Sequence, residues 1–305
     1  MLHVTNGTSV SLDRTGLGGE ILIWLDVLHE GPVPAGLSLK DLSRLRSKFL
    51  DSVWPGSPHS GAGLLASRDR ILGRFTDHDE VALWFEHDLF DQLQLIQILD
   101  WFHGRETGST RVSLICIDRY LGRLTGPQLA DLWPGRHRVT DAELDLATLA
   151  WHAFRSPDPM RIEELLHRDT SALPFLAGAL LRHLQQFPSV ENGLARTERQ
   201  IVELVEAGNR TFHTLFAADQ RREERIFMGD SSFARYVSGL SESRHPLLED
   251  DGGSYELTAT GREVMAGRAD HVRLNGINRW LGGVHLSGSE ALWRWDEKRR
   301  RLAPH

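Results

Sequence analysis

Four short apolar runs in the first 120 residues constrain the fold of this chain more than any other feature of its sequence. Three of them are almost continuously apolar and rich in β-branched residues, which is typical of strands covered on both faces. Helical periodicity appears between runs, at 38–53 and 89–102. The alternation predicts a parallel, Rossmann-like α/β domain over residues 1–135. The predicted strands are LHVT at 2–5, EILIWL at 20–25, EVALWF at 80–85 and RVSLICI at 111–117.

The strand pattern stops near WPGRHR, at residues 133–138, and helical patterns replace it. Thr140 and Glu143 have the T-x-x-E spacing of a capping box and are expected to begin a helix. We therefore predict an all-helical connector over residues 140–190. Its two further helices are expected at 158–167 and 173–187.

A different pattern begins at residue 194, where three helical segments lead to two extended runs around Gly252-Gly253. A Gly-Gly pair between extended runs is a strong signal for a hairpin turn. Thr197 and Gln200 have the spacing of a second capping box. This order predicts a winged-helix-like module over residues 194–305. The expected segments are helices at 197–207, 211–225 and 231–241, a hairpin from 246–249 and 254–258, and a last hairpin from 280–285 and 291–295.

The composition is that of an ordinary globular protein, with 40% hydrophobic and 25% charged residues in 305 positions. No apolar run is long enough to cross a membrane, and the N-terminus has no signal-peptide pattern. The single cysteine, Cys116, lies in an apolar run and is expected to be a buried thiol. These features predict a cytoplasmic protein with no membrane partner.

The formal charge of −7 lies entirely in residues 1–191, because residues 192–305 carry 17 basic and 17 acidic side chains. An acidic domain is a poor general binder of phosphate backbones. In the C-terminal module the third predicted helix contains only Arg235 as a base, and the hairpin turn carries Asp250 and Asp251. DNA is therefore a disfavoured partner.

Polar and ionisable residues follow all four predicted strands. Because parallel strands end at the same edge of a sheet, these residues are expected to converge on one cleft. The candidate catalytic residues are Asp26, His29, Glu86 and His87. The candidate ligand-binding residues are Asn6, Gly7, Thr8, Ser9, Asp88 and Arg119.

The loop from Asn6 to Ser9 has two interpretations. Gly7 allows a ligand to approach the backbone, and the hydroxyls of Thr8 and Ser9 stand at a possible helix start, which suits a phosphate. A capped turn explains the same residues equally well. The chain contains neither a Walker-type GxxxxGK[ST] nor a GxGxxG motif.

The run from Glu86 to Asp88 also leaves alternatives open. Glu86 and Asp88 could share a face and bind a hard divalent cation. His87 could instead be a general base, since an imidazole titrates near neutral pH. Asp88 also suits the N-cap of the next helix, a role that does not exclude a ligand. His29 lies in a loop where a structural turn and chemistry are equally supported.

Several longer strings occur together in the chain, namely HVTNGTS at 3–9, DVLHEGPVP at 26–34, LWFEHDLFDQLQL at 83–95 and RWLGGVHL at 279–286. With them the chain resembles bacterial proteins of the domain-of-unknown-function family 1835. That family has no established activity, so the resemblance implies no catalytic residues. Thr8 stands where the resemblance would place an acidic residue, which argues against a metal ion at that position.

Two functions follow from these patterns. In the first, the α/β domain binds a small anionic ligand, phosphorylated or nucleotide-like, and is coupled to the winged-helix-like module. In the second, the protein is a metal-assisted hydrolase or transferase that acts on a phosphorylated or nucleotide substrate, with a divalent cation held by Glu86 or Asp26.

Overall fold

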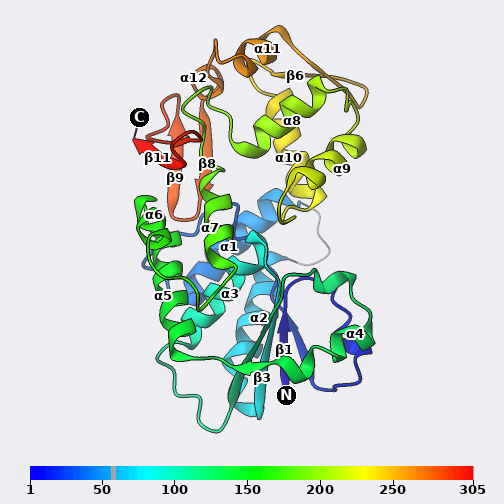
Figure 1. Cartoon of the computed structure of the whole chain (residues 1–305), viewed down its shortest axis with the longest axis vertical. Coiled ribbons are helices and arrows are strands. Elements are labelled where there is room, and N and C mark those ends of the chain that lie inside the picture. Colours follow the sequence, from blue (N-terminus) through cyan, green and yellow to red (C-terminus); the bar gives the residue numbers. More distant parts are fainter. Residues whose placement is uncertain (56–59, 305) are drawn as a thin grey trace. The chain divides into compact units, whose positions relative to one another are not determined.

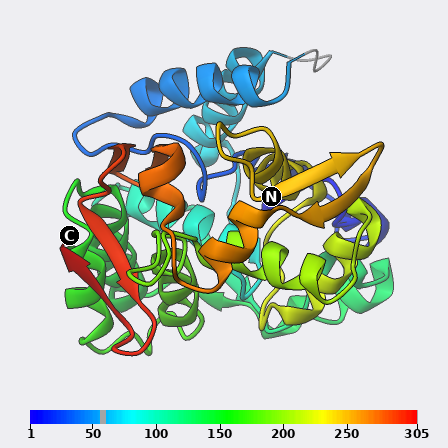
Figure 2. The same cartoon turned by 90° about the horizontal axis from the view of Figure 1, so that it is seen from above.

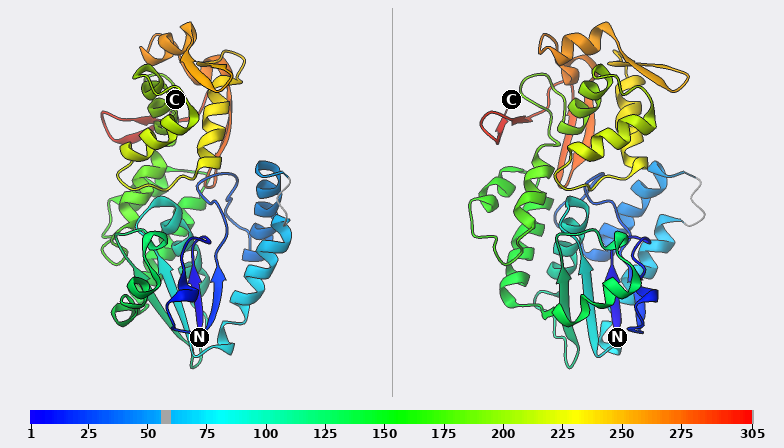
Figure 3. Two further views of the ribbon diagram at one scale, coloured as in Figure 1. Left: turned by 90° about the vertical axis from the view of Figure 1, so that its right-hand side faces the viewer. Right: turned by 45° about the vertical axis from the view of Figure 1, so that its right-hand side comes forward.

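The computed structural model describes residues 1–55 and 60–304 and shows a mixed α/β protein built on a five-stranded sheet. The strand order is β2-β1-β3-β4-β5, and β1 to β4 are parallel, which confirms the predicted parallel arrangement. Figure 3 shows these strands side by side. The strands are β1 Leu2–Thr5, β2 Glu20–Ile23, β3 Glu80–Phe85, β4 Arg111–Cys116 and β5 His137–Arg138.

The short strand β5 lies within the WPGRHR stretch at 133–138, where the sequence pattern predicted no strand. It pairs antiparallel with β4, through His137 opposite Leu114 and Arg138 opposite Ser113. A two-residue strand has no periodicity that a sequence pattern could reveal. Its physical role is to cover the edge of β4, whose backbone groups would otherwise be unpaired.

The first part of the chain contains both of the helices that the sequence predicted between the strands, at 38–53 and 89–102. Ser38 caps α1 by accepting a hydrogen bond from the backbone N–H of Asp41. Helix α2 has no counterpart in the prediction, since its apolar residues form only a weak stripe. The helices are α1 Leu39–Val53, α2 Gly61–Gly73, α3 Leu89–Phe102, α4 Gly126–Ala130, α5 Asp141–Arg155, α6 Met160–Leu166 and α7 Leu176–Leu184.

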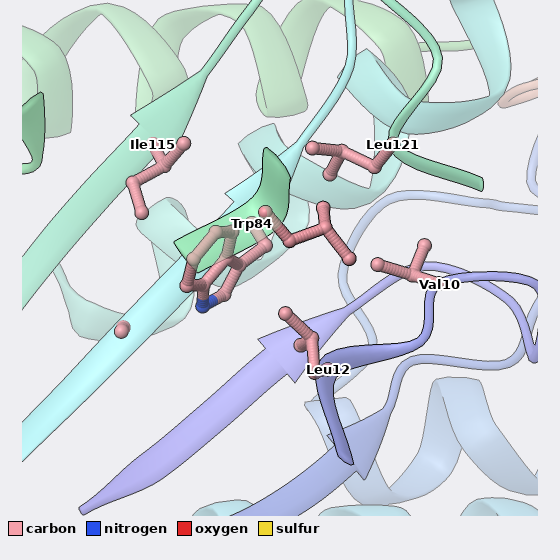
Figure 4. Close-up of a cluster of buried hydrophobic side chains, with 7 residues drawn as sticks. Val10, Leu12, Trp84, Ile115 and Leu121 are labelled. Carbon is pink, nitrogen blue, oxygen red and sulfur yellow. The ribbon is translucent and has the colours of Figure 1, made fainter. Parts of the chain in front are cut away.

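One face of the sheet is covered by short helical turns. Trp84 of β3 is fully buried there and packs with Leu12, Leu121 and Leu129, which come from connections and from α4 (Figure 4). In Figure 1, α4 lies on one side of the sheet and α5 on the other. The three-residue 3-10 turns are η1 Leu12–Arg14, η2 Phe75–Asp77, η3 Leu121–Arg123 and η4 Trp133–Gly135.

Helix α3 is buried almost all round, as expected for a helix enclosed between a sheet and a second layer. It contacts β3, and α5 packs along it. The described chain divides into two units, Met1–Ala179 with Gly282–Val284, and Leu180–Leu281 with His285–His305. Helices α5 and α6 of the expected connector therefore lie in the first unit. The boundary at residue 135 stays a prediction about independent folding.

The second unit contains three helices and then a hairpin that turns at Gly252 and Gly253 (Figure 2). Both glycines have positive φ, 61° and 90°, which a tight hairpin turn of this type requires. The elements are α8 Arg196–Glu206, α9 Phe212–Arg222, α10 Asp230–Ser241, β6 Leu248–Asp251, β7 Ser254–Leu257, α11 Ala259–Met265 and α12 His271–Asn275.

Two details of the second unit differ from the prediction. Helix α8 begins at Arg196, one residue before the expected start at 197, because Glu198, not Gln200, folds back to accept the backbone N–H of Ala195 at 2.8 Å. Trp280 and His285 lie on opposite strands of one hairpin, because the Gly282-Gly283 pair between them makes the turn. The chain thus ends in two hairpins, β8 Ile277–Leu281 with β9 Val284–Gly288, and β10 Trp293–Asp296 with β11 Arg301–Pro304.

Among the described residues, no helix combines the length and the apolar character that a membrane crossing needs.

Candidate functional site

Three carboxylates gather where β3 ends and α3 begins. Glu86 follows the last residue of β3, Asp88 precedes α3, and Asp91 lies in its first turn. One ligand atom from each of the three lies within 4.8 Å of the others. Asp88 and Asp91 are each 3% exposed, whereas Glu86 is partly exposed. We refer to Glu86, Asp88 and Asp91 as the acidic trio.

The local sequence holds the acidic trio in one arrangement. The Oδ1 atom of Asp88 accepts the backbone N–H groups of Phe90 at 2.9 Å and Asp91 at 3.2 Å, so Asp88 is the N-cap of α3. The Oδ1 atom of Asp91 accepts the backbone N–H of Glu86 at 2.9 Å. The turn between strand and helix is therefore closed from both ends by carboxylates, and their positions do not depend on mobile side chains.

Residues that follow β1 and β4 complete the site. The side-chain amide of Asn6 donates to Oδ2 of Asp91. The Oε1 atom of Glu86 accepts the backbone N–H of Leu121 at 2.6 Å, and the N–H of Gly122 also donates to this carboxylate. The ends of three parallel strands therefore meet at the acidic trio, as expected for the carboxyl edge of such a sheet.

The loop from Asn6 to Ser9 does not begin a helix, which corrects that expectation. The first helical turn after β1 is the 3-10 turn that starts at Leu12. Gly7 has a φ of 67°, and both Thr8 and Ser9 are exposed. The loop therefore has no helix N-terminus to offer a phosphate. A side chain at position 122 would meet Ser9, because an added Cβ would lie 2.6 Å from the Ser9 hydroxyl.

Burial raises the pKa values of all three carboxyl groups of the acidic trio. Desolvation and the neighbouring charge of Glu86 raise the pKa of Asp88 to about 7. Desolvation, together with the charges of Asp88 and Glu86, raises the pKa of Asp91 well above its usual range. Burial also raises the pKa of Glu86, although the N–H groups of Leu121 and Gly122 oppose this. At neutral pH the trio therefore needs either protons or a cation to offset its charge.

The donor atoms around the trio suit a hard divalent cation. Carboxylate and amide oxygens are the ligands that Mg²⁺ and Ca²⁺ prefer. While the Nδ2 atom of Asn6 is used by Asp91, its Oδ1 atom is buried and accepts no hydrogen bond from the described residues. The side chain of Asn6 thus contacts the trio through its amide nitrogen, and its unused amide oxygen is a candidate fourth ligand. The residues present therefore fit such an ion.

Asp26 is committed to a separate buried cluster. Its carboxylate accepts hydrogen bonds from two nitrogens of Arg46, the shorter at 2.7 Å, and lies 4.0 Å from the guanidinium of Arg68. All three side chains are at most 3% exposed. The structure thus gives Asp26 a charge-paired structural position. Its link to α3 is through the backbone, since its carbonyl accepts the side-chain amide of Gln94 at 2.7 Å.

The two candidate histidines are both buried and both lie against aromatic rings. The His29 ring is 5.6 Å from the ring of Phe90, the second residue of α3. The His87 ring is 4.9 Å from that of Tyr120 and 6.0 Å from that of Phe175. Arg119, in contrast, is exposed to solvent.

Cys116 lies close to the site but is not a nucleophile. Its sulfur accepts the amide of Gln92 at 3.4 Å, and burial raises the pKa of its thiol to about 12. A thiol with such a pKa carries almost no thiolate at neutral pH. The residue is partly exposed and not fully buried as expected, but its raised pKa agrees with the expectation of an unreactive thiol.

Sequence reasoning did not include Asp91 or the N–H groups of Leu121 and Gly122 among the site residues. Asp91 could have been found from its spacing, because residues three apart in the first turn of a helix lie on one face. The two backbone donors could not have been found from the sequence, because almost every residue has an N–H group. Only the packing of the loop after β4 directs these two toward Glu86.

No family model matches the chain, and no curated protein matches it. The resemblance to the domain-of-unknown-function family 1835 stays a prediction.

Proposed function

We propose that the acidic trio binds a divalent cation, and that the first unit uses this ion as a hydrolase or transferase on a phosphorylated or nucleotide substrate. The observation that carries the proposal is the convergence of three buried carboxylates within 4.8 Å. Their raised pKa values mean that charge neutralisation by a cation would be strongly favourable.

The acidic character of this edge supports the second of the two functions expected from the sequence. An anion would meet three carboxylates there, and the candidate arginine, Arg119, is exposed. Direct binding of a phosphate to this edge is therefore disfavoured by charge. A bound cation reverses the local sign and would let a phosphoryl oxygen approach. When bound, such an ion supplies Lewis-acid stabilisation of developing charge on a phosphoryl group.

The residues of the chain would provide the frame for this ion. Glu86, Asp88 and Asp91 would hold it, and the amide oxygen of Asn6 would be a neutral ligand. The N–H groups of Leu121 and Gly122 fix the orientation of Glu86. Such outer hydrogen bonds orient the ligands and adjust their basicity.

Cation binding is tested directly by titrating the full chain with Mn²⁺ and measuring the free ion by its electron paramagnetic resonance signal. Asp91→Asn is expected to weaken binding by at least tenfold, because outer and inner ligands contribute at this scale. Asp131→Asn, an exposed position at the end of α4, is the matched control and should bind as the wild type does. Equal binding by all three proteins would overturn the cation site.

The reaction is tested separately with p-nitrophenyl phosphate and a panel of nucleotides in the presence of Mn²⁺. Turnover that Asp91→Asn abolishes and Asp131→Asn preserves would support the proposal. Cation binding without turnover of any of these substrates would leave the metal site and refute the proposed reaction.

We further propose that α8, α9, α10 and the β6–β7 hairpin form a winged-helix-like module that does not bind generic duplex DNA. The order of elements supports the module, and Thr211 pairs with Ser254 beside the hairpin. Against DNA, Arg222 is paired with Glu203 and Arg182 with Glu223. The charge of Arg222, on α9, is thus offset within the unit, which reduces the positive charge that this helix offers to phosphates.

A further inference from the structure

A cavity of about 660 Å³ opens in the first unit between the start of α1, the end of α3 and helix α5. Its volume lies in the range of ordinary small-molecule sites. Asp91 and Asp100 are nine residues apart on α3, about 13 Å along the helix axis, so this cavity is separate from the acidic trio. The residues that matter for its chemistry are Gln97, Asp100, Trp101, Arg105, Trp151 and Arg155.

Arg155 is a buried cation at the end of α5. It is 8% exposed, and its Nε and Nη2 atoms donate to the carbonyls of Pro34 and Leu37 at 2.8–2.9 Å. Among the described residues no carboxylate forms an ion pair with it within 4.0 Å; burial lowers its pKa, and the charge of Asp100 in the same cavity partly opposes this. A guanidinium that is removed from water with only a more distant carboxylate to balance its charge is costly. It therefore favours an anion that can enter from the cavity.

Gln97 offers a second buried donor to the same cavity. It is 3% exposed, and its Oε1 atom accepts the indole N–H of Trp24 at 2.9 Å. This bond fixes the amide so that the carbonyl oxygen is used inside the protein. The two N–H bonds of its amide nitrogen have no acceptor among the described residues. A donor held in this way is already oriented for a ligand.

Arg105 and Asp100 complete the polar lining. The guanidinium of Arg105 lies 4.1 Å from the ring of Trp101, which holds the cation at the cavity by a cation–π contact. Asp100 is partly buried and lies 3.8 Å from the imidazole of His152. The cavity thus combines two guanidinium groups, an amide donor and one carboxylate acceptor.

We propose that this cavity binds a small organic oxyanion, whose anionic group is held by Arg155 and Arg105 and whose polar body is bound by Gln97 and Asp100. Guanidinium groups bind carboxylates and phosphates in the same bidentate geometry, so both ligand classes share this chemistry. The site goes beyond the proposed cation-dependent reaction and does not rest on it.

The proposal is tested by calorimetric titration of the full chain with inorganic phosphate, adenosine monophosphate and succinate, at constant ionic strength. Arg105→Gln removes one cation at an exposed position, and Ala35→Trp fills the cavity without changing either arginine. Each is expected to weaken binding by about tenfold or more, the scale of a lost charged hydrogen bond. Arg44→Gln, an exposed arginine of α1 that is paired with Asp41, is the matched control.

Binding of the phosphates alone would identify a phosphate ligand, and binding of succinate alone a carboxylate, and either would support the site when both variants weaken it. Failure of all three probes to bind the wild type would overturn the proposal. Equal binding by the wild type, Arg105→Gln and Ala35→Trp would also overturn it, because the anion would then bind elsewhere.

Discussion

Replacing Asp88 by Asn removes a buried charge from the acidic trio without removing the cap of α3. Asn is as good an N-cap as Asp, because its side-chain oxygen can accept the same N–H groups of Phe90 and Asp91. The substitution therefore separates the electrostatic role of Asp88 from its structural role. We expect it to stabilise the metal-free protein at alkaline pH.

The magnitude follows from the raised pKa of Asp88. Its ordinary value is 3.8 and its value in the folded protein is about 7, so the folded state holds the proton more tightly than the unfolded state. The contribution of Asp88 to the unfolding free energy is therefore most favourable below about pH 4 and is lost as the pH rises from there toward 7. A pKa difference of about 3 corresponds to about 4 kcal/mol, which is an upper limit because Asp91 and Glu86 share the same protons.

The assay is urea unfolding of the full chain between pH 5 and 8 in the presence of a chelator. Asp219 of the second unit also has a pKa raised to about 7, by burial and by Glu223, so a pH dependence is expected from it as well. The informative quantity is the difference between Asp88→Asn and wild type. Asp41→Asn, a half-exposed position in the first turn of α1, is the control.

We expect the difference in unfolding free energy to grow in favour of Asp88→Asn as pH rises. Mg²⁺ should then stabilise the wild type at pH 8 by mass action and should have less effect on Asp88→Asn. If the two proteins show parallel pH profiles, Asp88 does not titrate as argued. A loss of stability at pH 8 in Asp88→Asn would refute the reasoning altogether.

Four other predictions test the fold and the site. Arg46→Met leaves buried Asp26 with only the more distant Arg68 as a counter-charge and should lower the unfolding free energy by up to about 3–5 kcal/mol, which Asp26→Asn in the same chain should partly restore in urea unfolding. Gly126→Ala should lower the melting temperature, because its Cβ would lie 2.3 Å from the carbonyl oxygen of Arg14, with Gly104→Ala, which has open space but a positive φ, as a milder comparison. Residues 1–135 expressed alone should lack the near-ultraviolet circular dichroism of a packed core, because α5 no longer covers α3, whereas residues 1–179 should retain it. A packed 1–135 fragment would instead support the boundary expected from the sequence. A gel-shift assay should show no steep salt-dependent binding of generic duplex DNA, and such binding would contradict the proposal that the second unit does not bind it.

The sequence by itself determined the features that depend on neighbours a few residues apart. The apolar runs specified β1 to β4, the Ser38 and Asp88 caps specified where α1 and α3 begin, and Gly252-Gly253 specified a hairpin turn. Each of these signals is local, because periodicity, capping and turn geometry act within one or two turns of chain.

Only the tertiary structure decided which of the candidate polar residues act together. Asp26 and Asn6 were both candidate site residues because each follows a predicted strand. In the structure, however, Asp26 pairs with Arg46, and Asn6 contacts Asp91, 85 positions away. The raised pKa values of the acidic trio likewise come from burial, which the packing of α3 imposes and no local pattern encodes. Whether a carboxylate can bind a cation or is used in a structural ion pair depends on which charged groups lie beside it in the folded interior. Those neighbours are set by contacts between segments far apart in the chain.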